Sequence, residues 1–322
     1  MLQGKELILA TKAYAHEDRG KSWFHTISTL LLLVASLTAT LLAPYLTLRI
    51  AASILSGLLL VRMFVIYHDH QHHTILHKSP VANAIMTVFG IYILAPSSIW
   101  KRSHDYHHQN NSKLFSASIG SYPIVTKQKF DVMPAGERRL YLFTRHPLTI
   151  LFGYLFIFII GMCVNSFTSS PRKHFDALIA LILHVAASVA IIIFLGWTSW
   201  LLFLFIPFFI ACSMGAYLFY AQHNFPGVTF NDNGSWAYDK AAMHSSSFME
   251  MNPVMAWFTG NIGFHHIHHL NARIPFYRLP EAMEGIPELQ AAKRTSLRLR
   301  DIRDCFRLKV WDPHQGVMTG YK

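Results

Sequence analysis

The sequence predicts an all-α protein that crosses a membrane several times. Of its 322 residues, 52% are hydrophobic and only 14% are charged, which is too apolar for a soluble protein of this length. The apolar residues gather in runs close to the roughly 20 residues that a helix needs to span a bilayer. Clusters of histidine lie between these runs, so the polar chemistry is expected at the membrane edge.

The first two spans are predicted at 27–47 and 50–67. Residues 1–26 are polar and of mixed charge, which argues against a cleaved signal peptide and indicates a cytoplasmic N-terminal segment. Insertion is therefore expected to begin with the first span itself.

The apolar run 84–99 is short and contains Pro96, so it predicts an interfacial or re-entrant helix rather than a span. The histidine clusters agree with this interpretation. Clusters at 68–73, 104–108 and 265–269 can form one site only if an even number of crossings separates each from the next. The run 84–99, which lies alone between the first two clusters, then cannot cross.

Three apolar runs separate the second cluster from the third, and by the same parity one of them does not cross: 148–168, 177–195 and 200–221. If 148–168 spanned the membrane, Arg172 and Lys173 would lie outside, whereas the hairpin at 196–200 carries no charge. Positively charged loops remain inside, so 148–168 is predicted to be interfacial. Four spans result, with both termini and all three clusters cytoplasmic.

The remaining sequence divides the chain into three parts. The N-terminal segment 1–26 and the membrane domain 27–285 precede a basic cytoplasmic tail at 286–322, in which residues 293–309 suit a helix resting on lipid, on a partner or in solvent. The net charge of +11 fits positively charged cytoplasmic loops near anionic lipids and does not require nucleic acid as a partner. The three cysteines show no CxxC spacing and are expected to be free thiols.

Histidines repeat at spacings that place their rings on one face of a helix, at i and i+4 or at i, i+3 and i+4. They are His68 and His72 in YHDHQHH, His104, His107 and His108 in SHDYHHQ, and His265, His268 and His269 in FHHIHHL. Eight such rings exceed the four ligands of one structural zinc ion, so two metal ions are implied. Imidazole alone suits Zn, Cu, Fe or Ni. Asp69 and Asp105 are candidates to orient ligand rings, with helix capping as the alternative.

The motifs HDHQH, HDYHH and HHIHH, with the flanking WKRSH and GNIGFHHIHHLNARIPFYRLP, resemble the three histidine boxes of integral-membrane fatty acid desaturases. The resemblance covers about residues 60–285 and is closest to the bacterial acyl-lipid branch. It implies a non-haem diiron enzyme that uses O2 to introduce a cis double bond into a fatty acyl lipid. It also implies a separate electron donor, of the ferredoxin or cytochrome b5 type, and a place in the bacterial inner membrane with the active site cytoplasmic.

The same resemblance implies which residues bind the metal ions. The family's three boxes correspond to the eight spaced histidines, and its further ligand corresponds to His223 in YAQHNFPG. The first box departs from the usual HDxGH because it contains His70 and His73, and His73 is an alternative to His72. His266 lies between ligands in the sequence but is expected to point elsewhere.

Two other interpretations of the sequence remain at this point. A fatty acid or carotenoid hydroxylase would use the same diiron scaffold, and the boxes do not separate it from a desaturase. A membrane metal transporter would place His, Asp or Glu well inside several spans, whereas of these residue types only His184 lies deep here. His184 is expected either to hydrogen-bond another helix or to line an acyl channel.

Overall fold

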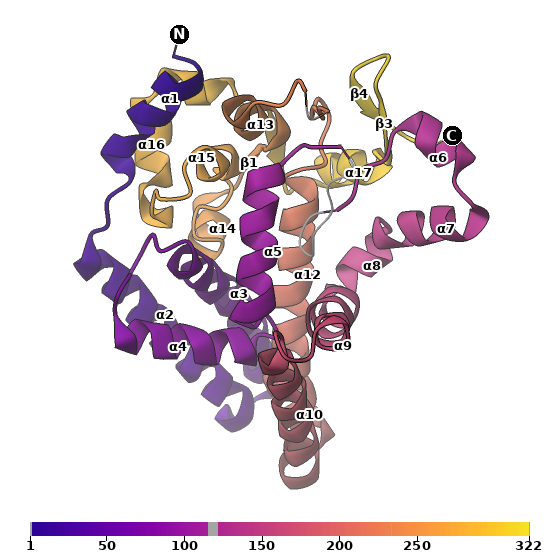
Figure 1. The fold of residues 1–322 in the computed structure, drawn as a ribbon. Helices are drawn as coiled ribbons and strands as arrows, with labels where there is room; N and C mark the ends of the chain where they lie inside the picture. Colours follow the sequence, from indigo (N-terminus) through magenta and orange to yellow (C-terminus); the bar gives the residue numbers. More distant parts are fainter. Residues whose placement is uncertain (1, 115–121, 233, 322) are drawn as a thin grey trace.

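The computed structural model describes residues 2–114, 122–232 and 234–321 (Figure 1). The α-helices are α1 (Gly4–Ala10), α2 (Arg19–Leu42), α3 (Leu46–Gln71), α4 (Pro80–Tyr92), α5 (Ser97–Asn110), α6 (Lys127–Val132), α7 (Ala135–Thr144), α8 (Pro147–Leu151), α9 (Ser166–Ser169), α10 (Phe175–Leu195), α11 (Trp197–Trp200), α12 (Ile206–Ala221), α13 (Tyr238–Ser245), α14 (Pro253–Phe258), α15 (His265–Leu270), α16 (Leu279–Gly285) and α17 (Leu299–Arg307). The 3-10 helices are η1 (Thr11–Tyr14), η4 (Phe276–Arg278) and η5 (Pro287–Ala291), and the π-helices are η2 (Tyr154–Asn165) and η3 (Leu201–Phe205). The strands are β1 (Phe248–Glu250), β2 (Arg294–Ser296), β3 (Val310–Asp312) and β4 (Val317–Thr319).

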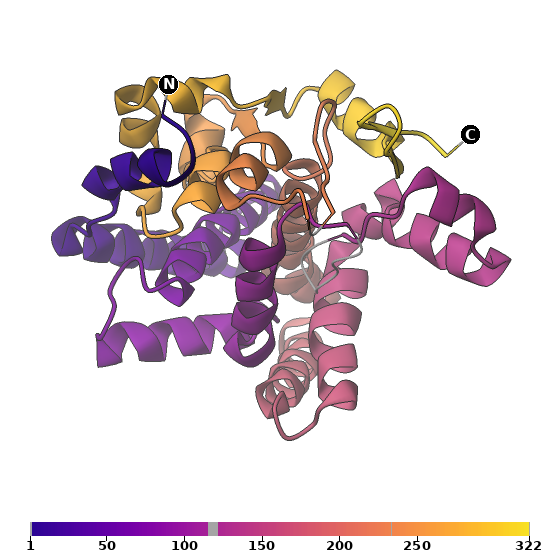
Figure 2. The ribbon, with the colours of Figure 1, turned by 45° about the horizontal axis from the view of Figure 1, so that its top comes forward.

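Within the described residues, four helices are long and apolar enough to cross a membrane, which confirms the predicted fold class with four transmembrane helices. They are α2, α3, α10 and the continuous helix Trp197–Ala221, which comprises α11, η3 and α12. In Figure 1 the short helices α13 to α16 and α1 gather at the end of the molecule opposite the free end of α10. Figure 2 shows both chain termini on this same side.

The ends of the first two spans differ from the predicted 27–47 and 50–67. Helix α2 begins at Arg19 because the Asp18 side chain accepts a hydrogen bond from the backbone N–H of Lys21 and caps the helix. It ends at Leu42 because Pro44 holds the preceding residue in an extended conformation. Helix α3 continues to Gln71, so the first histidine cluster lies on its last turn.

The two runs predicted not to cross form shorter or bent helices. Residues 84–99 fall on α4 and α5, whose axes meet at an angle of 92°, so this run is not one straight span. Residues 148–168 fall on α8, η2 and α9, and the apolar helix Tyr154–Ser169 is shorter than the four spans. The bend between α4 and α5 turns the second histidine cluster back toward the end of α3 (Figure 1).

The basic tail contains strands that the all-α prediction did not include. Strand β2 pairs in parallel with β1, with Phe248 opposite Arg294, and β3 pairs antiparallel with β4. The helix expected over 293–309 is therefore shorter, because Arg294–Ser296 are held in the strand. The tail is also tied to the membrane domain, since the Asn224 side chain donates a hydrogen bond to the Cys305 carbonyl at 2.7 Å.

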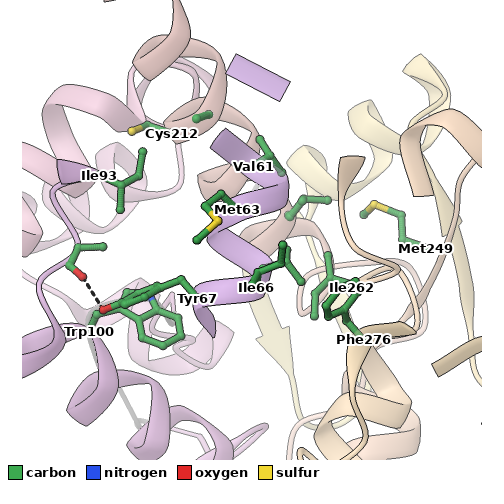
Figure 3. Close-up of a cluster of buried hydrophobic side chains, with 14 of the residues drawn as sticks. Val61, Met63, Ile66, Tyr67, Ile93, Trp100, Cys212, Met249, Ile262 and Phe276 are labelled. Carbon is green, nitrogen blue, oxygen red and sulfur yellow. Dashed lines mark hydrogen bonds between the residues drawn. The ribbon is translucent and has the colours of Figure 1, made fainter. Parts of the chain in front are cut away.

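The hydrophobic core surrounds α3 just before its histidines (Figure 3). Val61, Met63, Ile66 and Tyr67 of this helix are almost completely buried. The Tyr67 hydroxyl donates to the Ala95 carbonyl at 2.8 Å and thereby attaches the linker between α4 and α5 to α3. These contacts fix the second histidine cluster relative to the first.

A buried arginine joins α3 to the segment that leads to the third cluster. Arg62 is 2% exposed, its Nε donates to Thr29 Oγ1 on α2 at 3.2 Å, and it also donates to the Trp257 carbonyl on α14. Its guanidinium lies 4.0 Å from the centre of the Trp257 ring. A charge this deep in a span needs such partners, and here they hold the N-terminal approach to α15 against α3.

His184 connects two helices inside the membrane. Its Nε2 is hydrogen-bonded to the Tyr154 hydroxyl of η2, so of the two alternatives the structure supports the helix contact. We expect His184→Leu to leave the activity of the protein unchanged and to lower stability by about 1 kcal/mol or less, as is usual for polar contacts between membrane helices. Thermal unfolding in detergent and product analysis of the same preparation measure both. Tyr154→Phe removes the other partner of this hydrogen bond and should have the same effects as His184→Leu. A loss of turnover at normal stability in either variant would contradict a purely structural role for His184.

Candidate metal centre

Four separate elements bring the predicted ligand residues together. His68 and His72 come from the end of α3, the second cluster from α5, His223 from the turn after α12, and the third cluster from α15. They form two groups in which the nitrogen atoms lie within 4.8 Å of one another. The five-histidine group is His68, His72, His104, His108 and His268, and the four-histidine group is His107, His223, His265 and His269. All nine predicted residues are therefore present, and no other residue joins either group within the described part of the chain.

In the five-histidine group the Nε2 atoms lie at nearly equal separations. His104 Nε2 is 3.0 Å from His68 Nε2 and 3.1 Å from His108 Nε2. His268 Nε2 is 3.0 Å from His108 Nε2. The Nε2 atom of His72 is buried and has no hydrogen-bond partner.

The four-histidine group has the same spacing. His223 Nε2 lies 3.0 Å from His107 Nε2 and 2.9 Å from His265 Nε2, and His265 Nε2 lies 3.1 Å from His269 Nε2. Two nitrogens bonded at about 2.1 Å to one ion and at right angles to each other would be separated by about 3.0 Å. Both groups therefore fit a metal ion by donor type and by spacing.

The hydrogen bonds on the far side of two rings fix their tautomers. His223 Nδ1 lies 2.9 Å from the Ser245 carbonyl, which only accepts, so Nδ1 carries the proton and Nε2 carries a lone pair. Both His107 and His265 approach this one lone pair, and at most one of them can donate to it. A cation that accepts electron pairs from all three rings satisfies the arrangement.

Asp69 supports the five-histidine group in the same way. Its Oδ1 lies 3.0 Å from His68 Nδ1, its Oδ2 accepts from the backbone N–H of Phe276 at 2.7 Å, and the residue is 2% exposed. The carboxylate thus turns the His68 Nε2 lone pair toward the group and connects the first cluster to the chain beyond the third. Asp105, the other candidate for such a role, instead pairs with Lys101 on the outer side of α5 at 2.8 Å, because the two lie at i and i+4 there.

Burial favours the neutral form of several of these rings. It lowers the pKa of His223 to about 4, against the opposing effect of the Ser245 hydrogen bond. Burial, followed by the proximity of neighbouring rings, also holds the pKa values of His265, His268 and His269 well below the usual value. Neutral imidazole is the form that binds a metal ion.

The structure separates ligand candidates that the sequence left as alternatives. His72 belongs to the five-histidine group, whereas His73 adopts a positive φ of 57° and its ring packs on His77 instead. His70 and His266 are buried but lie outside both groups. Whether a histidine belongs to a group therefore depends on the direction in which its position in the backbone points the ring.

Two largely apolar cavities in the described part of the chain reach the histidine groups. The inner cavity runs along α3 and α12 and is lined by Val61, Phe64, Val65, His68, Ile93, His104, Phe158, Ala211, Cys212, Gly215, Leu218, Phe219, Gln222, Ile262 and His265. The outer cavity, of about 490 Å³, lies between α5, α7, η2 and α12, and His104 and Trp100 form part of its wall. Sequence reasoning did not identify the lining residues of these cavities, because apolar side chains inside a membrane domain have no distinguishing pattern.

Aromatic side chains shield the histidines where the cavities meet them. The Trp100 ring stacks on His104 with centroids 4.6 Å apart, and the Phe219 ring lies 5.7 Å from that of His104. The fold and the site together define an integral-membrane protein with a histidine-rich metal site facing apolar cavities. Such a site is suited to chemistry on a long apolar chain.

Comparison with known proteins identifies the family. The fatty acid desaturase family model matches residues 40–300, and the chain belongs to this family. It is 28% identical over 276 residues to a fatty acid desaturase of Bacillus subtilis, an alignment that covers 85% of this chain and 78% of the relative. It is 22% identical to the sn-1 oleoyl-lipid 12-desaturase of a Synechocystis strain, over 83% of this chain and 76% of the relative.

A third relative is an sn-1 acyl-lipid omega-3 desaturase (ferredoxin) of a Nostoc strain, which is 24% identical over 72% of this chain and 66% of its own length. These relatives and the family match establish a membrane fatty acid desaturase, an oxidoreductase that acts on fatty acyl lipids. The sequence-based prediction of family and activity is thereby confirmed.

Proposed function

We propose that the two histidine groups bind two iron ions, one in each group, and that the enzyme uses O2 to introduce a cis double bond into a fatty acyl chain. The convergence of nine histidines, seven of them buried and two partly buried, into two groups is the observation that carries this proposal. Zinc has no redox chemistry, and the removal of hydrogen from an unactivated methylene requires a strong oxidant, which reduced iron supplies with O2. A metal transporter is not supported, because these ligands lie at the ends of spans rather than along a path through them.

The reaction balances when two electrons come from outside. The neighbouring carbons of the chain lose two hydrogens, and O2 takes up these hydrogens together with two electrons and two protons to give two molecules of water. The residues of the chain hold the centre in place for this chemistry. Asp69 and Ser245 fix the tautomers of His68 and His223, and Phe219 and Trp100 keep bulk water from the rings.

We infer that a separate small protein supplies the electrons, of the ferredoxin or cytochrome b5 type. One relative carries ferredoxin in its name, and the net charge of +11 favours an acidic carrier. Membrane lipids are the surrounding solvent and the source of the acyl substrate.

We propose that both termini and the metal centre face the cytoplasm of a bacterial cell, with the protein in the inner membrane. Four spans are an even number of crossings, so both termini lie on the same side of the membrane. The positive charge of the connecting segments favours the cytoplasm as that side. In this arrangement residues 27–285 form the catalytic unit. The segments 1–26 and 286–322 rest on it through contacts such as the backbone N–H of Gly4 donating to Asp239 at 3.0 Å.

Expression in a host without polyunsaturated lipids tests the reaction. We expect new cis double bonds when fatty acids are mapped by mass spectrometry, and with ¹⁸O2 we expect the label in water and none in the lipid. Labelled hydroxy fatty acids as the main product would instead identify a hydroxylase and contradict the proposal. A host that expresses His108→Ala serves as the control and should form neither product.

A further inference from the structure

The inner and outer cavities share part of their walls beside the metal centre. Five residues line both of them: Phe64, His104, Phe158, Gly215 and Phe219. Four of these carry large rings. Gly215, in the middle of α12, is the only member without a side chain, so in the wall that the two cavities share no side chain covers its backbone.

Helix packing does not explain this glycine. A Cβ atom added at Gly57 would lie 2.7 Å from Ile210, and one added at Gly153 would lie 2.8 Å from Ala216, so those two glycines allow helices to approach closely. A Cβ atom added at Gly215 would meet only Phe158 Cζ, at an ordinary 3.9 Å. Glycine inside a helix costs about 0.5–1 kcal/mol relative to alanine, and here no contact between helices offsets that cost.

We propose that Gly215 is the residue that lets the acyl chain pass from the outer cavity into the inner one, and that its missing side chain determines which chains reach the metal centre. This inference rests on the proposed desaturase reaction and names a specificity-determining residue for it. The chain passes across the Gly215 backbone, beside the rings of Phe64 and Phe158. His104, which lines both cavities, then lies beside the carbons that lose hydrogen.

The inner cavity determines how much of the chain lies beyond this point. Its lining includes Val61, Ile93 and Cys212, which are 4%, 2% and 0% exposed. Val61 precedes His68 by seven residues, or about 10 Å along a helix. An extended hydrocarbon advances about 1.3 Å per carbon, given C–C bonds of about 1.5 Å, so the distance from His68 to Val61 corresponds to about eight carbons on the methyl side.

The outer cavity leads toward the membrane. Its wall includes Leu140 and Phe143 of α7, which are 62% and 46% exposed. Exposed apolar side chains on a short helix beside basic residues suit the boundary between head groups and acyl chains. The carboxyl end of the substrate and its head group therefore remain on this side of Gly215.

Graded substitution tests the role of Gly215. We expect Gly215→Leu to bind as much metal as the wild type and to desaturate 16- and 18-carbon chains at least 100-fold more slowly. Gly215→Ala should unfold at the same or a higher temperature and should turn over about tenfold more slowly. Gly136→Leu is the matched control, because a Cβ atom there meets nothing within 4 Å and Gly136 lines neither cavity.

A binding measurement keeps this test independent of turnover. A spin-labelled fatty acid should bind metal-free wild type and Gly136→Leu protein equally, and should bind Gly215→Leu at least tenfold more weakly. Equal binding or equal turnover by Gly215→Leu would overturn the assignment. If Gly215→Leu does not fold, Gly215→Ala decides by the same two measurements. If the wild type forms no double bonds, the proposed desaturase reaction is wrong. The binding measurement still tests the role of Gly215 in that case, because it does not depend on turnover.

Discussion

His265→Ala is expected to abolish desaturation, whereas the same substitution at the neighbouring His266 leaves most of it intact. His265 Nε2 lies 2.9 Å from His223 Nε2 and 3.1 Å from His269 Nε2, so its loss opens the four-histidine group. His266 is equally buried but belongs to neither group. We expect His265→Ala to reduce turnover at least 100-fold and metal content from about two ions per chain to about one, since even residues that only support ligands affect activity by 10- to 100-fold.

The two adjacent variants separate a ligand from a packing residue. His266→Ala removes a ring from a filled site and should destabilise the protein by about 2–3 kcal/mol while it retains both ions. Metal analysis and thermal unfolding of the two purified variants give the comparison. Full metal content in His265→Ala, or loss of one ion from His266→Ala alone, would contradict the assignment of the four-histidine group.

Asp69→Asn is expected to weaken metal binding by about 10- to 100-fold, the usual range for a group that orients a ligand. The amide oxygen can still accept from His68 Nδ1, but the amide nitrogen then faces the backbone N–H of Phe276, where the carboxylate accepts at 2.7 Å. Two N–H donors then face each other, so the introduced asparagine side chain is expected to rotate away. The hydrogen bond that holds the proton on His68 Nδ1 is lost as a result. Chelator competition on purified protein measures the change in affinity.

Asp105→Asn is the matched control for this prediction. Asp105 also follows a ligand candidate directly in the sequence, but its carboxylate pairs with Lys101 at a partly exposed position, where such pairs contribute little. We expect a change in metal affinity of less than about twofold. Equal effects of the two substitutions would show that Asp69 acts through general electrostatics rather than through His68.

The sequence predicted the four spans and the set of histidines because both depend on features that a linear pattern carries. Span length follows from the thickness of the bilayer, and ligand spacing follows from the helical repeat. The requirement for an even number of crossings then brought the three clusters to one face. These steps needed no knowledge of side-chain packing.

The choice between His72 and His73 needed the structure, because it depends on where α3 ends. His72 closes the last turn of the helix, and His73 reverses into a positive φ and leaves the group. The roles of Asp69 and Asp105 were indistinguishable for a similar reason. Each follows a ligand candidate, but only Asp69 meets a distant backbone N–H, that of Phe276.

The strands of the tail and the walls of the cavities were also beyond prediction. Strand β2 forms only because β1, distant in the sequence, lies beside it. In the sequence Gly215 is an ordinary small residue of a membrane helix, and only the structure shows that it lines both cavities. Contacts between distant segments decide both features, and local patterns do not encode them.

Iron analysis of the purified protein tests the central claim most directly. Protein expressed in iron-replete cells and purified in detergent should contain about two iron ions per chain, and it should lose desaturation when a chelator removes them and regain it with ferrous iron. Full occupancy by zinc without iron, together with normal formation of double bonds, would contradict the account.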